Sequence, residues 1–205
     1  MPIVAKLISS AINSQLSLNT LTGRDAIKLA GVIGSAISKY LMIPNMVTCS
    51  LSGVVGPIGS INSVTVAGLV PAAMSGFMYS KAISKNLKGR DVKKLFDAVS
   101  MGLTQVLMGM VLSGSAVGIA IGTGVGNFTA LSEQALSKLL YATMLSKQLK
   151  GRDAVKLCDC ISFGVVTHLK TSVKFTVVVT GVIAPVPPAG PIAIAGVPSV
   201  FTKIS

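Results

Sequence analysis

Apolar residues recur at intervals of three and four residues along six segments of this chain. In residues 136–149, the positions Leu136, Leu140 and Met144 lie on one face of a helix. Residues 5–16 and 74–87 mix apolar and polar residues in a similar way. Residues 29–41, 95–107 and 157–169 carry a second set of such faces. The pattern predicts six amphipathic helices arranged as three consecutive pairs.

The two helices of each pair are separated by a short phrase that occurs three times. It reads Leu-Thr-Gly-Arg-Asp-Ala-Ile-Lys-Leu at 21–29, Leu-Lys-Gly-Arg-Asp-Val-Lys-Lys-Leu at 87–95 and Leu-Lys-Gly-Arg-Asp-Ala-Val-Lys-Leu at 149–157. The glycines are Gly23, Gly89 and Gly151, so the copies are offset by 66 and 62 residues. An internal repeat of this length indicates that one structural unit is built three times.

The residue types in the phrase predict a helix–helix corner. Glycine adopts the left-handed conformation that ends a helix, and aspartate caps the free N–H groups of the next one. Arginine at the corner covers the last carbonyls of the first helix or pairs with a neighbouring copy. The order differs from the Arg-Gly-Asp of integrin ligands, so we prefer this structural interpretation to a ligand site. The nine corner residues are Gly23, Arg24, Asp25, Gly89, Arg90, Asp91, Gly151, Arg152 and Asp153.

After its second helix, each copy becomes rich in Val, Ile, Thr and Gly, as in 46–57 followed by 63–70 and in 173–185 followed by 191–198. These residues favour strands, and the Gly-Pro clusters favour the turns between them. We therefore expect an α+β fold of three tandem repeats, each a helix–Gly-Arg-Asp corner–helix followed by a two-stranded β ribbon. The units would span residues 3–72, 73–132 and 133–205.

The composition is unusually apolar and basic. Hydrophobic residues make up 51% of the 205 residues and charged residues only 12%. In ordinary soluble domains about a quarter of the residues are charged. A chain with so few charged residues must cover its surface with a membrane or a large assembly. The net charge is +12, with Lys and Arg mainly in the predicted helices. This excess indicates acidic protein neighbours, nucleic acid or anionic lipid, unless the lysines only solubilise exposed helix faces.

Three charge-free stretches raise the alternative of a membrane-active protein of the holin or bacteriocin type. They are residues 40–80, 98–132 and 175–202, and the second holds Gly114, Gly118, Gly122 and Gly126 at the four-residue spacing of packed membrane helices. However, the third stretch holds five prolines, which a continuous helix does not tolerate. Trp is absent, so no aromatic belt is visible. A membrane location is therefore not favoured.

The chain has no recognisable catalytic constellation. His168 is the only histidine, and the predicted helix around it has no acid near it, which favours a packed residue over a catalyst. Cys49, Cys158 and Cys160 lack the spacing of a zinc site and are expected to be free thiols, buried or partly buried. The glycine-rich segment 122–127 lacks the Lys-Ser/Thr of a phosphate loop. We expect no enzyme activity, no cofactor and no metal.

The third copy carries a resemblance to a known class. The segment 161–170 leads into the Val/Thr-rich 173–179, a Thr-Gly turn, a Pro/Gly-rich loop and the ending Thr-Lys-Ile-Ser. This order resembles small structural proteins of tailed bacteriophages. The resemblance implies a virion component of the tail, baseplate or neck, assembled in the host cytoplasm.

The triple repeat adds to this expectation, because three copies in one chain can act as a covalent pseudo-trimer. We expect ribbons that add strands to neighbouring sheets, other virion proteins with acidic surfaces as partners, and a homo-oligomer around a symmetry axis. Contact with packaged DNA is a further hypothesis, which predicts binding that falls steeply with salt.

Overall fold

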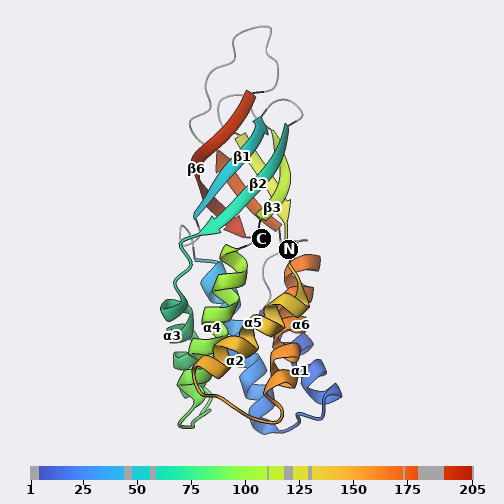
Figure 1. Ribbon diagram of the computed structural model, residues 1–205, viewed down its shortest axis with the longest axis vertical. Helices are drawn as coiled ribbons and strands as arrows, with labels where there is room; N and C mark the ends of the chain where they lie inside the picture. Colours follow the sequence, from blue (N-terminus) through green and yellow to red (C-terminus); the bar gives the residue numbers. More distant parts are fainter. Residues whose placement is uncertain are drawn as a thin grey trace.

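Two layers are stacked end to end in the computed structural model of this chain: a bundle of helices and a barrel of strands (Figure 1). The structure describes residues 5–43, 48–55, 59–109, 111–117, 122–128, 131–172, 174–179 and 192–204. For the strands it describes the backbone and its pairing.

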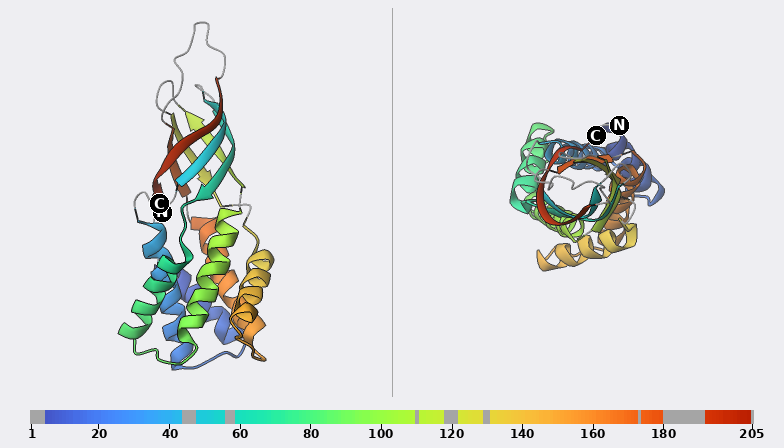
Figure 2. Two further views of the ribbon diagram at one scale, coloured as in Figure 1. Left: turned by 60° about the vertical axis from the view of Figure 1, so that its left-hand side comes forward. Right: turned by 90° about the horizontal axis from the view of Figure 1, so that it is seen from above.

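The predicted helices are confirmed. The first copy forms α1 (Ala5–Leu18) and α2 (Arg24–Leu41), the second α3 (Pro71–Ser84) and α4 (Val92–Met108), and the third α5 (Glu133–Ser146) and α6 (Ala154–Ser172). Each helix packs on the next in chain order, and α6 packs on α1. The six helices therefore form a closed ring, which is visible down the long axis in the right-hand view of Figure 2.

The strands form a second closed ring. They are β1 (Thr48–Val55), β2 (Gly59–Ala67), β3 (Val111–Val117), β4 (Gly122–Asn127), β5 (Lys174–Val179) and β6 (Ile192–Ile204). Neighbours in chain order pair antiparallel, and β1 also pairs antiparallel with β6. The result is one six-stranded barrel that sits on the helical ring.

The predicted fold class needs correction. An α+β protein with three two-stranded ribbons was expected, but the described hydrophobic core lies in the six helices and in the short segments next to them, the latter holding Leu69, Phe128 and Leu131. The strands belong to one closed barrel rather than to three ribbons. Every described strand has a partner on both sides, which also contradicts the idea that the ribbons add strands to neighbouring sheets. Ring closure is a long-range pairing that local strand propensity does not encode.

Small residues let neighbouring copies approach closely in the helical ring. Gly102 on α4 lies against Leu140 on α5, and Gly164 on α6 lies against Ile12 on α1. A Cβ atom at Gly102 would stand 2.8 Å from Leu140 Cδ2, and one at Gly164 would stand 2.8 Å from the backbone nitrogen of Ile12. The repeat offset places the buried Ala36 at the equivalent position of the first copy. The contacts of the second copy with the third and of the third with the first thus use the same small-against-large pair, and the first copy has a small residue at the equivalent position.

A serine–aspartate hydrogen bond ties the two helices together in the second and third copies. Ser75 donates to Asp97, and Ser137 donates to Asp159, at the same offset within each copy. In the first copy, Ser9 bonds the carbonyl of Ala5 instead, and Gly31 occupies the position of the aspartate. Two of the six acids of the chain therefore serve packing between helices.

The charge-free stretches hold strands as well as helix ends. Gly114 lies in β3 opposite Gly126 of β4, while Gly122 begins β4, and Gly118 lies outside the described residues. The three described glycines of the four-residue ladder are therefore not on a helix. Among the described helices, none combines the length and hydropathy needed to cross a membrane.

Candidate binding hollow at the repeat corners

Each corner begins with the same helix-ending turn. Thr20, Asn86 and Gln148 have positive φ angles of 60°, 55° and 60°. The amide of the following leucine donates to a carbonyl in the last turn of the helix, from Leu21 to Leu16 at 2.8 Å and with the same offset in the other copies. This is a Schellman motif with a non-glycine residue in the left-handed position. The prediction that the corner glycine ends the helix is wrong, and only Gly23 of the three has a positive φ, 143°.

All three aspartates of the phrase form ion pairs, and for Asp25 and Asp91 no predicted side-chain cap is formed. Neither α2 nor α4 has a side-chain cap hydrogen bond, and Asp25 lies inside the first turn of α2. Each aspartate pairs with the lysine three residues later, over N–O distances of 3.0 to 3.4 Å: Asp25–Lys28, Asp91–Lys94 and Asp153–Lys156. The Asp-x-x-Lys spacing was present in all three copies and was the signal that sequence reasoning missed.

The arginines of the phrase are exposed at all three corners. In the described part of the chain, Arg24, Arg90 and Arg152 make no ion pair and no hydrogen bond. The predicted roles of covering helix carbonyls or pairing with a neighbouring copy are therefore wrong for the described residues. Three guanidinium groups remain open to an external partner.

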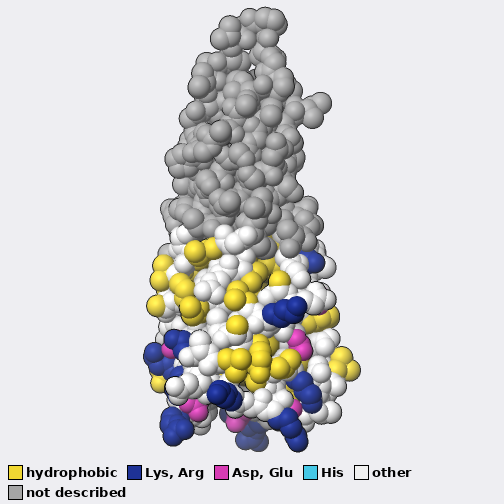
Figure 3. Space-filling model, in the orientation of Figure 1, with side chains coloured by type: hydrophobic (Ala, Val, Ile, Leu, Met, Phe, Trp, Pro, Cys, Tyr) yellow, Lys and Arg dark blue, Asp and Glu magenta, His cyan; other side chains and the backbone are white. Residues whose placement is uncertain are grey.

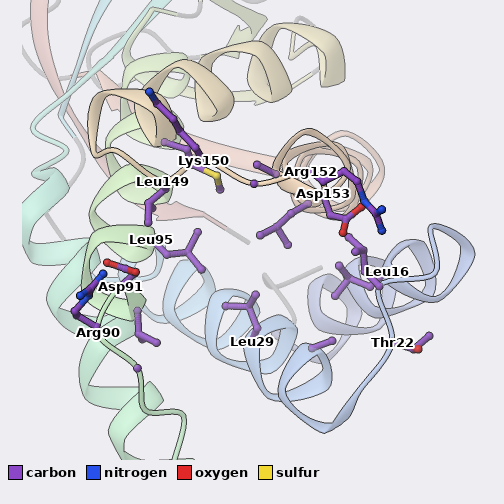
Figure 4. Close-up of a pocket in the computed structure, with 18 residues that line it drawn as sticks. Leu16, Thr22, Leu29, Arg90, Asp91, Leu95, Leu149, Lys150, Arg152 and Asp153 are labelled. Carbon is purple, nitrogen blue, oxygen red and sulfur yellow. The ribbon is translucent and has the colours of Figure 1, made fainter.

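The corners of the second and third copies meet the first copy around one open hollow of about 770 Å³, which we call the corner hollow. It lies at the end of the helical ring that faces away from the barrel. In Figure 4, Leu16, Leu29, Leu95 and Leu149 point toward its centre, with Arg90–Asp91 and Arg152–Asp153 at opposite edges. Six predicted corner residues thus line it: Gly89, Arg90, Asp91, Gly151, Arg152 and Asp153. Gly23, Arg24 and Asp25 do not; the first copy contributes apolar residues and Thr22 instead.

We call the surface around this hollow the corner end, formed by residues 16–29, 82–95 and 144–157. It is strongly basic, as the blue side chains at the foot of Figure 3 show. Each aspartate of the phrase is already paired with one lysine. These aspartates therefore do not neutralise the charge of the other cations. Besides the three lysines paired with these aspartates, the corner end holds Arg24, Lys85, Lys88, Arg90, Lys93, Lys147, Lys150 and Arg152, of which Lys93 pairs with Asp97.

The other candidate residues lie away from this hollow. His168 is buried on α6, and burial lowers the pKa of its imidazole, which favours the neutral ring at pH 7. Cys158 and Cys160 are free and buried, as predicted. For Cys49 the structure describes only the backbone, in β1. Among the described residues, no group of three His, Cys, Asp or Glu side chains is placed to hold a metal ion.

The buried thiols carry a testable prediction. Burial, reinforced by the nearby Asp159 carboxylate, raises the pKa of the Cys158 thiol to about 12, and burial also raises that of Cys160. A raised pKa keeps the thiol protonated and unreactive at pH 8. We expect iodoacetamide at pH 8 to leave both cysteines unmodified in the native chain and to alkylate both in urea, as read by peptide mass spectrometry. Rapid native alkylation of Cys158 would contradict the described packing of α6.

No protein-family model, curated protein or solved structure matches this chain. What the corner end can bind is therefore inferred from its own residues. An apolar floor with a basic edge can bury an apolar side chain and pair with carboxylates beside it. Its two aspartates, Asp91 and Asp153, each pair with a lysine.

Proposed function

We propose that this chain is a non-enzymatic structural component of a viral particle, in the tail, baseplate or neck of a tailed phage. In this role it acts as a covalent pseudo-trimer. The observation that carries the proposal is that both the helical ring and the barrel are assembled from three successive copies and close within one chain. One chain thereby offers three quasi-equivalent corners around one axis, where a homotrimer would need three chains.

Two further points support the proposal. The third copy resembles small phage structural proteins in the order of its segments, and this resemblance is the basis for assigning the chain to a virion. The basic corner end matches the acidic partner surfaces expected from the net charge of +12. The homo-oligomer and the contact with DNA stay predictions. One chain already supplies the threefold arrangement, so a homo-oligomer is not needed to produce it.

Gradient fractionation of the native source tests the proposal. We expect the chain to co-migrate with dense particles at a fixed ratio to other structural proteins, followed by mass spectrometry. A pseudo-trimer on a threefold axis should be present at about one copy for every three copies of a threefold-symmetric neighbour. Recovery in the membrane pellet, with release only by detergent, would instead support the membrane-active alternative and overturn the virion assignment.

A further inference from the structure

We propose that the corner end is a socket for the acidic end of a threefold-symmetric protein, whose apolar tip enters the corner hollow. This inference rests on the proposed function, because it assumes that the chain works by docking on a neighbour. It names the surface and the chemistry of that neighbour. The described strands all have both edges paired in the barrel, so strand addition is not the mode of docking.

The hollow has an incompletely covered apolar lining. Leu29 and Leu95 are only partly buried and point into the hollow, so their contact surface is incomplete. Further exposed apolar residues lie within one helical turn of the corners but do not line the hollow, with Leu18 at 75% and Ile27 at 60% exposure. The others are Ile83, Leu145 and Val155. A hollow lined by incompletely buried leucines marks an interaction site rather than ordinary surface.

The charges select the partner. The arginines at the corners have no partner in the described chain, and every corner aspartate is occupied by a lysine. A basic edge around an apolar floor complements a protein surface that carries carboxylates around an apolar group. Duplex DNA would satisfy the arginines but leave the leucines uncovered. A bilayer surface is flat, and the leucine floor is recessed within a hollow of about 770 Å³, which suits a protruding group.

The symmetry of the partner follows from the repeat. Ile27, Lys93 and Val155 occupy the same position in the three copies, and all three are exposed at the corner end. The three arginines are related by the same offsets. A partner with three equal arms meets an equivalent arginine at each corner, whereas a single arm meets only one. The end of a three-helix coiled coil has this arrangement.

The test uses a synthetic three-stranded coiled coil, tethered at its far end, whose strands terminate in Leu-Glu-Glu. Calorimetry measures its binding to the full chain. We expect binding that weakens with salt and that falls about tenfold or more in a chain carrying Arg24→Glu, Arg90→Glu and Arg152→Glu. The matched control carries Lys6→Glu, Lys138→Glu and Lys170→Glu, which are exposed residues outside the corner end with the same change in net charge. The control should bind like the parent chain. Circular dichroism checks that both variants fold.

Three results would overturn the inference. The first is equal binding of a coiled coil that ends in Leu-Lys-Lys. The second is equal binding of the untethered acidic strand, which would remove the threefold requirement. The third is no binding of the coil while the three arginine changes abolish binding to duplex DNA or to phosphatidylserine vesicles. In each case the proposed function still stands if the chain co-migrates with particles, so the two failures are distinguishable.

Discussion

Replacing Gly164 by alanine should lower the free energy of unfolding by about 1–3 kcal/mol, although alanine is the better helix former. The added Cβ atom would stand 2.4 Å from Ile12 Cγ1, 2.8 Å from its backbone nitrogen and 3.1 Å from its Cα. Real contacts are longer, so α6 must move away from α1. Because this seam joins the last helix to the first, the strain falls on closure of the helical ring.

Two other glycines make this a graded series. Gly102→Ala should be milder, because its nearest neighbour is the end of the flexible Leu140 side chain rather than backbone. Gly76→Ala is the matched control, since Gly76 is exposed within α3 and a Cβ atom there meets nothing within 4 Å. It should raise the stability by roughly 0.5–1 kcal/mol through helix propensity and chain entropy. Urea unfolding measures all three variants. A stabilised Gly164→Ala chain would mean that α6 does not pack on α1 at this point.

Removing the hydroxyl of Tyr40 should also be costly. The Tyr40 side chain is fully buried at the end of α2. Its hydroxyl oxygen accepts from the amide of Val70 at 2.6 Å and donates to the carbonyl of Val70 at 3.1 Å. In the variant, the Val70 carbonyl keeps its bonds from the amides of Ala73 and Met74. The Val70 amide loses its acceptor, because a phenylalanine ring has no hydroxyl oxygen. Tyr40→Phe should therefore lower the free energy of unfolding by about 1–3 kcal/mol.

Hydrogen exchange provides a local readout for this variant. The Val70 amide should exchange faster in Tyr40→Phe, because it loses its acceptor where the chain leaves the barrel and enters α3. Tyr79→Phe is the control: Tyr79 is exposed on α3, and its change should stay within about 0.5 kcal/mol. Unchanged exchange at Val70 together with unchanged stability would show that the two residues are not bonded in solution.

The corner residues show where sequence reasoning succeeded and where it did not. It found the three phrases and the six helices because both are local: a helical face is written in spacings of three and four residues. It misplaced the roles of the aspartates, since capping and ion pairing both favour an acid in the first turn. Asp91 stands at the N-cap of α4, as expected, but its carboxylate pairs with Lys94. Because α2 begins at Arg24, Asp25 lies inside that helix and pairs with Lys28.

The sequence by itself determined that this chain is a threefold repeat of helix pairs with a basic corner in each copy. Only the tertiary structure decided that the copies close into two rings, and that two Gly-Arg-Asp corners and the leucines of the first copy share one hollow. The reason is physical. Helix propensity acts within a few residues, whereas the contacts of β6 with β1 and of α6 with α1 join segments from opposite ends of the chain. Residues such as Gly164 and Ile12 acquire their meaning only once that closure is made.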